Sequence, residues 1–365
     1  MRIGLFVDQL FYKVPGGIGT YVENMVREFG RLDHEDAYCL FHCGQAGSVR
    51  IPGGGFTERK LPGGRKALGL GWHSLGLPRL EWFTGPLDLV HAPGLVIPGS
   101  RAPLVVTVHD LCVVKFPEWF PRRWQAFHSR GLALAMKRAS AILVDSESTF
   151  IDLLELYPGS GKRVRVVPLG VEAPAQSDPE RVQASLRRMG ITGEFALFVG
   201  TLEPRKNLPR LIEAFGRVAG ERTLVLAGAP GWGYQDVLEA AERSGSRVKL
   251  MGYVGPLELE ALFAGATLFA YPSLYEGFGL PVLEAMARGV PVLTSNISSL
   301  AEVGEGACLM VDPQDLDSMA EGLQDLLSDA GLRERLRAAG REKAAGYTWE
   351  KTARATLAAY REVVR

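Results

Sequence analysis

Short apolar runs alternate with helical patterns along almost the whole chain, and this alternation limits the possible folds more than any other feature of the sequence. Each run is too short for a buried helix but long enough for a strand that is covered on both faces. Strands separated by helices pair in parallel through right-handed crossovers. In the first half of the chain we predict such strands at residues 3–7, 87–91, 104–108, 141–144 and 164–167.

A second series of apolar runs follows, so the sequence predicts two doubly wound α/β domains rather than one. This series comprises residues 195–199, 223–226, 248–250, 267–270, 290–294 and 307–311. A chain of 365 residues is also too long for one typical core. We expect a Rossmann-like domain at 1–170, a partly helical linker at 171–190, a second Rossmann-like domain at 191–347 and a C-terminal helix at 348–365.

Composition and charge exclude several classes of protein. Of the residues, 47% are hydrophobic and 22% are charged, which is typical of a globular enzyme. The net charge is zero and no long basic run appears, so we expect no nucleic-acid partner. No apolar run reaches the ~20 residues of a membrane helix, and the opening run is too short for a signal peptide, so we expect a cytoplasmic protein. The four cysteines lack the paired spacing of a zinc site.

The segment from Glu276 to Glu284 sets two carboxylates around a glycine-rich helix start. Gly277 and Gly279 lack Cβ atoms, so backbone N–H groups can approach an anion closely there. Pro281 suits the first turn of a helix, whose free N–H groups and dipole favour phosphate. Carboxylates at both ends of the segment can accept hydrogen bonds from sugar hydroxyls. The segment therefore indicates a sugar-nucleotide site, although a glycine-rich turn alone is also typical of an ordinary helix start.

A second motif, Gly200 to Asn207, follows the first predicted strand of the C-terminal half. Arg205 can grip phosphate oxygens as a fork, and Lys206 can act as a point charge. Together they would offset the negative charge that builds on a departing diphosphate.

These two motifs resemble the signatures of the retaining glycosyltransferases of family four, which adopt the GT-B fold. The match includes the Gly-Phe-Gly-Leu-Pro stretch, the Glu-Ala-Met-Ala that follows Leu283, and the Arg-Lys-Asn of the second motif. The resemblance implies two Rossmann-like domains facing across a cleft that holds a nucleotide-sugar donor, with the C-terminal helix crossing back to the N-terminal domain. It also implies that Glu284 binds the ribose and Glu276 the donor sugar.

The N-terminal half contributes further positions through the same resemblance. The loop before residue 21 would cover the diphosphate, with Gly17 matching the glycine that faces the phosphate, and His109 would lie near the donor sugar. The expected acceptor-binding residues are Gly16, Gly17, Asp110 and Ser146, although Ser146 is equally suited to cap a helix. The expected donor-binding residues are Gly17, Gly200, Arg205, Lys206, Tyr253, Val254, Glu276, Gly277, Phe278, Gly279, Leu280 and Glu284, and the expected catalytic residues are His109, Arg205, Lys206 and Glu276.

The function implied by the resemblance is retaining transfer of a hexose, with mannose from GDP-mannose as the best choice, to a glycan, lipid-linked or small-molecule acceptor. No acidic pair of the metal-binding type lies near the predicted phosphate site, so we expect neither a metal nor another cofactor. A catalytically silent homologue in a glycan-assembly complex, or a sugar-nucleotide epimerase, is the alternative.

Two basic segments of the N-terminal half leave membrane contact open. Arg59, Lys60, Arg65 and Lys66 flank a Pro/Gly-rich stretch, and Arg122 and Arg123 lie beside Trp119, Phe120 and Trp124. Such a mixture suits an anionic or lipid-linked acceptor at a membrane surface, and it is also typical of a solvated loop. The acceptor and the oligomeric state are not determined by these patterns.

Overall fold

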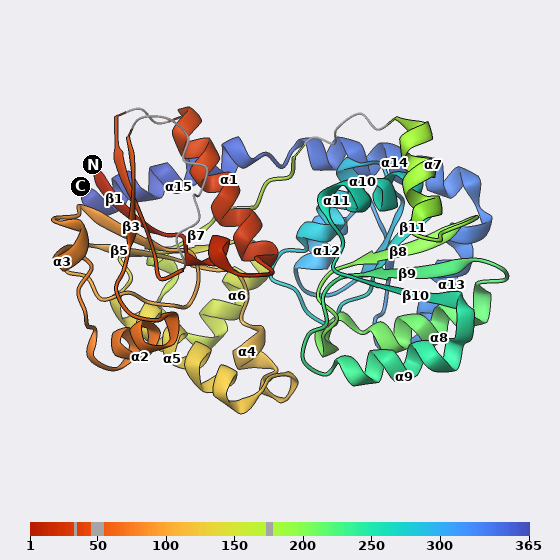
Figure 1. Ribbon diagram of the computed structural model, residues 1–365, viewed down its shortest axis with the longest axis horizontal. Helices are drawn as coiled ribbons and strands as arrows, with labels where there is room; N and C mark the ends of the chain where they lie inside the picture. Colours follow the sequence, from red (N-terminus) through yellow and green to blue (C-terminus); the bar gives the residue numbers. More distant parts are fainter. Residues whose placement is uncertain (33–34, 45–54, 173–177) are drawn as a thin grey trace. The chain divides into compact units, whose positions relative to one another are not determined.

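The computed structural model describes residues 1–32, 35–44, 55–172 and 178–365, which form two compact units (Figure 1). Unit 1 comprises Met1–Gly170 together with Thr348–Arg365, and unit 2 comprises Val171–Tyr347. Each unit contains one parallel sheet surrounded by helices. The predicted α/β class with two doubly wound domains is therefore confirmed.

The sheet of unit 1 has the strand order β3-β2-β1-β4-β5-β6-β7, and all of its neighbouring strands are parallel. The order reverses between β1 and β4, and ligands of open α/β sheets bind at the carboxyl ends of strands near such a reversal. The strands are β1 (Arg2–Phe6), β2 (Ala37–His42), β3 (Phe56–Lys60), β4 (Leu89–Ala92), β5 (Leu104–Val108), β6 (Ala141–Val144) and β7 (Val164–Val166).

The sequence pattern does not predict β2 and β3. β3 reads Phe-Thr-Glu-Arg-Lys and forms the edge of the sheet, where charged side chains face solvent and protect the open strand. In β2 the buried side chains include His42, whose Nε2 lies 2.8 Å from Glu58 Oε1 on β3. Because Glu58 on the next strand is a polar partner, His42 can be buried in β2. A search for wholly apolar runs does not detect such a strand.

The helices of unit 1 include one from the C-terminus of the chain. Tyr360 of α15 places its ring 5.9 Å from that of Phe29 and its hydroxyl 2.6 Å from His91 Nδ1, and Thr352 Oγ1 donates to the carbonyl of Pro168. These contacts group α15 with unit 1. The helices are α1 (Gly16–Leu32), α2 (Arg65–Leu75), α3 (Glu81–Thr84), α4 (Cys112–Lys115), α5 (Arg122–Arg138), α6 (Glu147–Leu156) and α15 (Trp349–Val364), with 3₁₀ turns at Asp8–Phe11, Pro117–Trp119 and Gly161–Arg163.

The sheet of unit 2 has the order β10-β9-β8-β11-β12-β13 and is also parallel. Its order reverses between β8 and β11, so the carboxyl ends of these two strands form the expected ligand edge. The strands are β8 (Phe195–Val199), β9 (Thr223–Ala227), β10 (Val248–Gly252), β11 (Leu268–Tyr271), β12 (Val292–Ser295) and β13 (Leu309–Val311).

The helices of unit 2 begin with α7, within the segment expected to be a linker. Leu186 of α7 is buried against the position of Gly265, where a Cβ atom would lie 2.5 Å from its Cδ1. The linker at 171–190 is thus partly a packed helix, and its residues 173–177 lie outside the described residues. The helices are α7 (Pro179–Arg188), α8 (Leu208–Val218), α9 (Tyr234–Ser244), α10 (Pro256–Gly265), α11 (Leu280–Ala287), α12 (Ser298–Gly304), α13 (Leu316–Ser328) and α14 (Ala330–Ala345), with 3₁₀ turns at Pro204–Lys206 and Gly245–Arg247.

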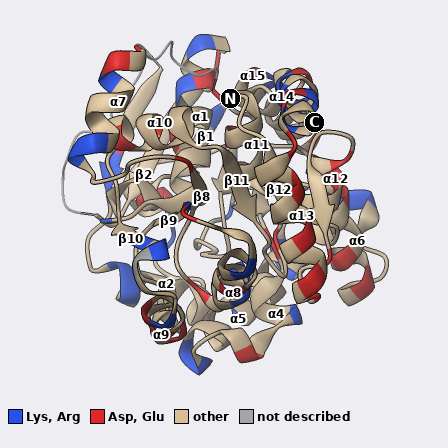
Figure 2. Cartoon of the chain, turned by 90° about the vertical axis from the view of Figure 1, so that its right-hand side faces the viewer, with Lys and Arg blue, Asp and Glu red and all other residues tan. Residues whose placement is uncertain are grey.

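Charge is spread over the surface helices with both signs interspersed, as Figure 2 shows for α7 and α9. In the described part of the chain, no helix is long and apolar enough to cross a membrane.

Candidate active site

The two motifs of unit 2 meet at the carboxyl edge of its sheet. The first follows β8, where Pro204–Lys206 forms a 3₁₀ turn and Asn207 takes a left-handed conformation with φ of 60° before α8. The Asn207 side-chain amide donates to the carbonyl of Pro272, at 3.2 Å, and to that of Pro313, at 2.7 Å. Because Pro272 directly follows β11, Asn207 fixes the two loops that leave the reversal point of the sheet.

Glu276, which begins the motif of residues 276–284, lies between Arg205 and Lys206 of the motif that follows β8. Its Oε1 accepts a hydrogen bond from Lys206 Nζ at 2.5 Å, and its Oε2 accepts one from Arg205. Both Glu276 and Lys206 are buried. Two residues that the sequence analysis missed complete the cluster, since Glu203 accepts from Arg205 Nε and the Tyr271 hydroxyl accepts from Lys206 Nζ. The sequence-predicted residues Arg205, Lys206 and Glu276 are thus in direct contact.

The cluster contains two cations and two carboxylates, and their mutual attraction decides their protonation. Burial by itself would raise the pKa of Glu276, but Arg205 and Lys206 outweigh this effect and lower it to about 2. Burial lowers the pKa of Lys206, and the charge of Arg205 lowers it further, while Glu276 opposes both effects. Glu276 therefore stays ionised at neutral pH and holds the two cations side by side.

The loop after Glu276 leads into α11 through a backbone that requires glycine. Gly279 has a φ of 98°, and a Cβ atom there would lie 2.6 Å from Leu300 Cδ2. Leu280 then begins the helix with Pro281 in its first turn. The hydroxyl groups of two residues of α12 fix the loop: Ser298 Oγ accepts from the Glu276 N–H, and Ser299 Oγ donates to the Glu276 carbonyl at 2.8 Å.

The remaining residues of this loop have local packing partners. The ring of Phe278 is buried and lies 5.9 Å from that of Tyr347 in an edge-on arrangement. Gly277, Gly279 and Leu280 lead into the N-terminus of α11, where Pro281 has no N–H and the N–H groups of Val282 and Leu283 donate to the Gly279 carbonyl. An anion at this end of α11 would be stabilised by the helix dipole.

Glu284 lies one turn inside α11 and carries an electrostatically unfavourable charge. Burial raises the pKa of its half-buried carboxyl group to about 7, which Arg288 opposes only in part. Among the described residues, no donor forms a hydrogen bond with this carboxylate. Arg288 instead pairs with Glu260. A carboxylate without a hydrogen-bond donor in the protein is expected where the group accepts hydrogen bonds from ligand hydroxyls.

Two other predicted regions of unit 2 lie at neighbouring strand ends. Gly200 follows β8 and packs against Gly228, which follows β9. A Cβ atom added at Gly228 would lie 1.8 Å from the Gly200 carbonyl oxygen. Tyr253 and Val254 connect β10 to α10, and the side chain of Tyr253 is 63% exposed.

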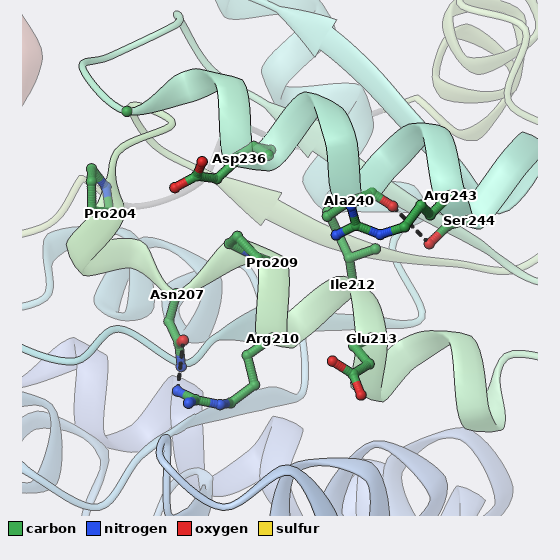
Figure 3. A pocket seen from close by; sticks show the side chains of 12 residues that line it. Pro204, Asn207, Pro209, Arg210, Ile212, Glu213, Asp236, Ala240, Arg243 and Ser244 are labelled. Carbon is green, nitrogen blue, oxygen red and sulfur yellow. Dashed lines mark hydrogen bonds between the residues drawn. The ribbon is translucent and has the colours of Figure 1, made fainter.

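A groove of about 500 Å³ lies beside the first motif but is separate from the cluster (Figure 3). It runs between α8 and α9, and Asn207, Arg210 and Asp236 contribute to its wall. Arg205, Lys206 and Glu276 do not line it. Its charged walls carry both signs, so the groove gives no indication of a specific ligand.

The predicted residues His109, Asp110 and Ser146 follow the carboxyl ends of β5 and β6. His109 follows β5, and its Nδ1 lies 2.6 Å from Asp145 Oδ2 after β6. Burial would lower the pKa of His109, but the carboxylate of Asp145 raises it above its ordinary value. The ring of Tyr21 packs edge-on against His109 at 5.0 Å, and its hydroxyl lies 3.2 Å from Thr107 Oγ1. The histidine is therefore held in a fixed orientation that favours the charged ring.

The other predicted residues of unit 1 have different environments from those expected. Gly16 and Gly17 form the first turn of α1 instead of a preceding loop, and a Cβ atom at either position would meet nothing within 4 Å. The Asp110 carboxylate accepts from the Cys112 N–H. Ser146 is fully buried and caps α6 by accepting from the Thr149 N–H, so the expected acceptor contact of Ser146 is not supported.

Several residues of the site were not identified from the sequence. Asp145 follows the strand next to β5, so the rule that ligand-facing groups emerge at carboxyl strand ends could have identified it. Glu203 lies inside the predicted motif but was not given a role. Tyr271, Ser298 and Ser299 give no signal in the sequence, because only the folding of β11 and α12 brings them to Glu276.

No group of three or more His, Cys, Asp or Glu in the described ranges is arranged to hold a metal ion. The four cysteines are free thiols.

Comparisons with known proteins cover both halves of the chain. The family model "Glycosyl transferases group 1" matches residues 189–343, and "Glycosyltransferase Family 4" matches residues 15–173. The O-antigen chain mannosyltransferase B of Escherichia coli is 33% identical over 286 residues, which cover 75% of this chain and 74% of that protein. The D-inositol 3-phosphate glycosyltransferase of Salinispora arenicola is 31% identical over 347 residues, or 86% and 76% of the two chains.

Solved structures show the same architecture. A sucrose-phosphate synthase from Thermosynechococcus elongatus matches with a TM-score of 0.77 and 19% identity over 99% of this chain and 98% of that one. At this identity the likeness concerns the fold alone. The family resemblance and the GT-B fold predicted from the two motifs are thereby confirmed.

Proposed function

Because the chain belongs to the family of glycosyl transferases group 1 and is a glycosyltransferase, we propose that it moves mannose from GDP-mannose to a glycan acceptor with retention of anomeric configuration. The observation that carries the proposal is the contact of Arg205 and Lys206 with the buried carboxylate of Glu276 at the ligand edge of unit 2. The choice of mannose is supported by the similarity to a mannosyltransferase of O-antigen synthesis.

The proposed donor site uses each group for a different part of the ligand. The diphosphate faces Arg205, Lys206 and the N-terminus of α11, where the cations and the helix dipole both favour negative charge. The ribose hydroxyls donate to the carboxylate of Glu284, which otherwise lacks a donor among the described residues. Glu276 holds the two cations and accepts from hydroxyls of the sugar.

In the proposed reaction, the acceptor oxygen forms a bond to the anomeric carbon, while the bond from this carbon to the diphosphate oxygen breaks. The electron pair of the broken bond stays on the diphosphate, and the acceptor's hydroxyl proton moves to the departing phosphate oxygen on the same face of the sugar. Arg205 and Lys206 stabilise the charge that develops on the leaving group. No protein carboxylate is assigned as a base.

We further propose that the reaction needs no metal, because Arg205 and Lys206 supply the positive charge that Mg²⁺ provides at other diphosphate sites. Turnover should be unchanged after treatment with EDTA. Loss of activity on chelation, with recovery on addition of Mg²⁺, would refute metal independence without affecting the assignment of the donor.

The acceptor is proposed to be a growing glycan, which can be lipid-linked, and the reaction is proposed to take place in the cytoplasm. The similarity to an enzyme of O-antigen chain synthesis supports a glycan acceptor in polysaccharide biosynthesis. The similarity to an inositol phosphate glycosyltransferase keeps a small acceptor among the compounds to be screened.

Donor binding is tested first by thermal stabilisation with GDP-, UDP-, ADP- and dTDP-sugars. A ligand at 100 times its dissociation constant adds about 2.7 kcal/mol to the native state. GDP-mannose should stabilise the wild type, and Lys206→Met should abolish the effect, whereas Lys162→Met, at an exposed lysine of unit 1, should retain it. If a different nucleotide sugar stabilised the protein, that sugar would be assigned as the donor instead of GDP-mannose. If no nucleotide sugar stabilised the protein, the donor site itself would be refuted.

Transfer is tested with the same variants and radiolabelled donor. Glu276→Gln should remove turnover, because a neutral amide cannot hold both cations. A catalytically silent homologue would show no turnover even for the wild type. An epimerase would convert the donor when no acceptor is present.

A further inference from the structure

Tyr271 is the last residue of β11, one of the two strands that flank the reversal point of the unit 2 sheet. Its side chain is buried, and its ring stacks on those of Phe198 at 5.4 Å and Phe269 at 5.7 Å. Thr294 Oγ1 on β12 donates to the Tyr271 carbonyl at 3.0 Å. Because the sheet holds both the ring and the backbone, the phenolic hydroxyl group has a fixed position at the ligand edge.

The hydroxyl of Tyr271 accepts a hydrogen bond from Lys206 Nζ, which lies 4.8 Å from the centre of the tyrosine ring. The same Nζ donates to Glu276 Oε1 at 2.5 Å. An ammonium group has three N–H donors, and among the described residues the third donor of Lys206 has no acceptor. Since the bonds around this nitrogen are tetrahedral, two fixed donors also fix the direction of the third.

The two acceptors of Lys206 differ in charge. Burial raises the pKa of Tyr271 well above its ordinary value, and the carboxylate of Glu276 raises it further. The phenol is therefore neutral at physiological pH. It orients the ammonium group of Lys206 without cancelling its charge, whereas a second carboxylate in this place would do both.

Direction matters in this cluster because its charges balance. The cations of Arg205 and Lys206 pair with the carboxylates of Glu203 and Glu276, so four charged groups carry no net charge. A cluster of this kind favours a diphosphate only through donors that already point towards the phosphate oxygens. A group that fixes one of these donors contributes to binding without contacting the ligand.

We propose that Tyr271 is a positioning residue that directs the remaining N–H of Lys206 towards the β-phosphate of a bound nucleoside diphosphate. Tyr271 acts through Lys206, because a donor that is fixed before binding loses less conformational freedom when the ligand arrives. The inference rests on the proposed function, since it takes the diphosphate to bind beside Arg205 and Lys206. It adds a residue that makes the site selective for a ligand with a second phosphate.

The test compares a nucleoside diphosphate with its own monophosphate, which lacks the β-phosphate. GDP, UDP, ADP and dTDP are titrated into the wild type by calorimetry, and the diphosphate that binds most tightly is used. Tyr271→Phe keeps the packed ring and removes the hydroxyl. This variant should bind the diphosphate roughly tenfold more weakly and the monophosphate less than about twofold more weakly. General damage to the fold of unit 2 would weaken the binding of both nucleotides equally.

The matched control is Tyr360→Phe in unit 1. Tyr360 is also fully buried, and its hydroxyl lies 2.6 Å from a side-chain nitrogen, His91 Nδ1. The control thus loses the same chemical group from the same kind of contact, outside unit 2. It should keep the wild-type ratio of diphosphate to monophosphate affinity, whatever its melting temperature.

A double variant tests whether Tyr271 acts through the lysine. Lys206→Met and Lys206→Met with Tyr271→Phe should bind the diphosphate equally weakly at millimolar concentration, because the donor to be directed is absent in both. The proposal is overturned if Tyr271→Phe keeps the wild-type affinity ratio, or if it weakens diphosphate binding further when Lys206 is already replaced. If no diphosphate binds the wild type, the proposed donor site fails together with this inference, whereas an unchanged ratio in Tyr271→Phe removes only the role of Tyr271.

Discussion

The substitution Glu284→Gln should make the protein more stable and less able to bind its donor. The carboxyl group of Glu284 is half-buried on α11, and burial raises its pKa from 4.5 to about 7. The folded state therefore disfavours the charged form, and a neutral amide of the same size avoids this cost. The destabilising charge would be retained because ribose hydroxyls need an acceptor with two oxygens.

The expected magnitude follows from the pKa. A rise from 4.5 to about 7 corresponds to about 3 kcal/mol at a pH above both values. Because part of the side chain reaches solvent, screening reduces this to about 1–2 kcal/mol. Between pH 4.5 and 7 the native state binds more protons than the unfolded state, so the wild-type stability that depends on Glu284 falls as pH rises through this window.

The assay is urea unfolding of wild type and variant at pH 4 and pH 8. At pH 4, below both pKa values, the two proteins should differ by less than about 0.5 kcal/mol, and at pH 8 the variant should be more stable by about 1–2 kcal/mol. Glu258→Gln, at an exposed residue of α10, is the control and should show no such pH-dependent gain. Equal stability of Glu284→Gln and wild type at pH 8 would refute the argument that Glu284 carries a buried, unfavourable charge.

The functional half of the prediction uses the same variant. Replacing one carboxylate oxygen with an NH₂ group places a donor against a ribose hydroxyl and removes a charge-assisted hydrogen bond worth about 1.5–3 kcal/mol. Donor affinity, measured by calorimetry at pH 8, should fall roughly 10-fold to 100-fold. A variant that gained stability but bound the donor unchanged would separate the buried charge from ribose recognition.

Three further perturbations test the structure of unit 2. Asn207→Ala should destabilise the protein by about 2–3 kcal/mol in chemical denaturation, because it removes two hydrogen bonds to carbonyls from a residue with positive φ; Asn207→Gly should cost less, since glycine accepts that φ. Gly228→Ala should destabilise the protein by more than about 3 kcal/mol or prevent folding, because its Cβ would lie 1.8 Å from a carbonyl oxygen. A Cβ atom at Gly216 on α8 meets nothing, so Gly216→Ala should stabilise the protein by about 0.5–1 kcal/mol. Equal melting temperatures of these two variants would contradict this packing. Stability should fall as pH drops from 4.5 towards 2, because the pKa of Glu276 is lowered to about 2 in the native state, and Glu276→Gln should lose this part of the acid transition in a pH titration of unfolding.

Much of the fold was predictable because buried parallel strands are locally visible. A strand covered on both faces is apolar throughout, so runs such as 104–108, 141–144 and 195–199 appear in the sequence with the bounds that the structure gives them. β3 could not be found in this way, since an edge strand carries charged side chains that resemble a loop. The packing of α7 was also not predicted, because an otherwise polar helix that packs against α10 through Leu186 resembles a linker in the sequence.

The core of the site was predictable for a similar reason. Arg205, Lys206 and Glu276 lie in short motifs whose local geometry is set by glycine and proline, so neighbouring residues indicate their chemistry. Tyr271 carries no such local signal, because its role depends on which strand lies beside which, and Asp145 is indicated only by its position after a predicted strand. Ser146 shows the opposite error, since a helix cap and a ligand contact require the same residue type.

The sequence by itself determined the two doubly wound domains and the cations and carboxylates of the two motifs, because these depend on residue type and short-range spacing. Only the tertiary structure decided that Glu276 binds both cations, since its partners lie about 70 residues away in the chain. It likewise decided that α2 and α5 pack side by side, although they are far apart in the sequence. Long-range contacts of this kind depend on strand order and helix packing, which no local pattern of residues specifies.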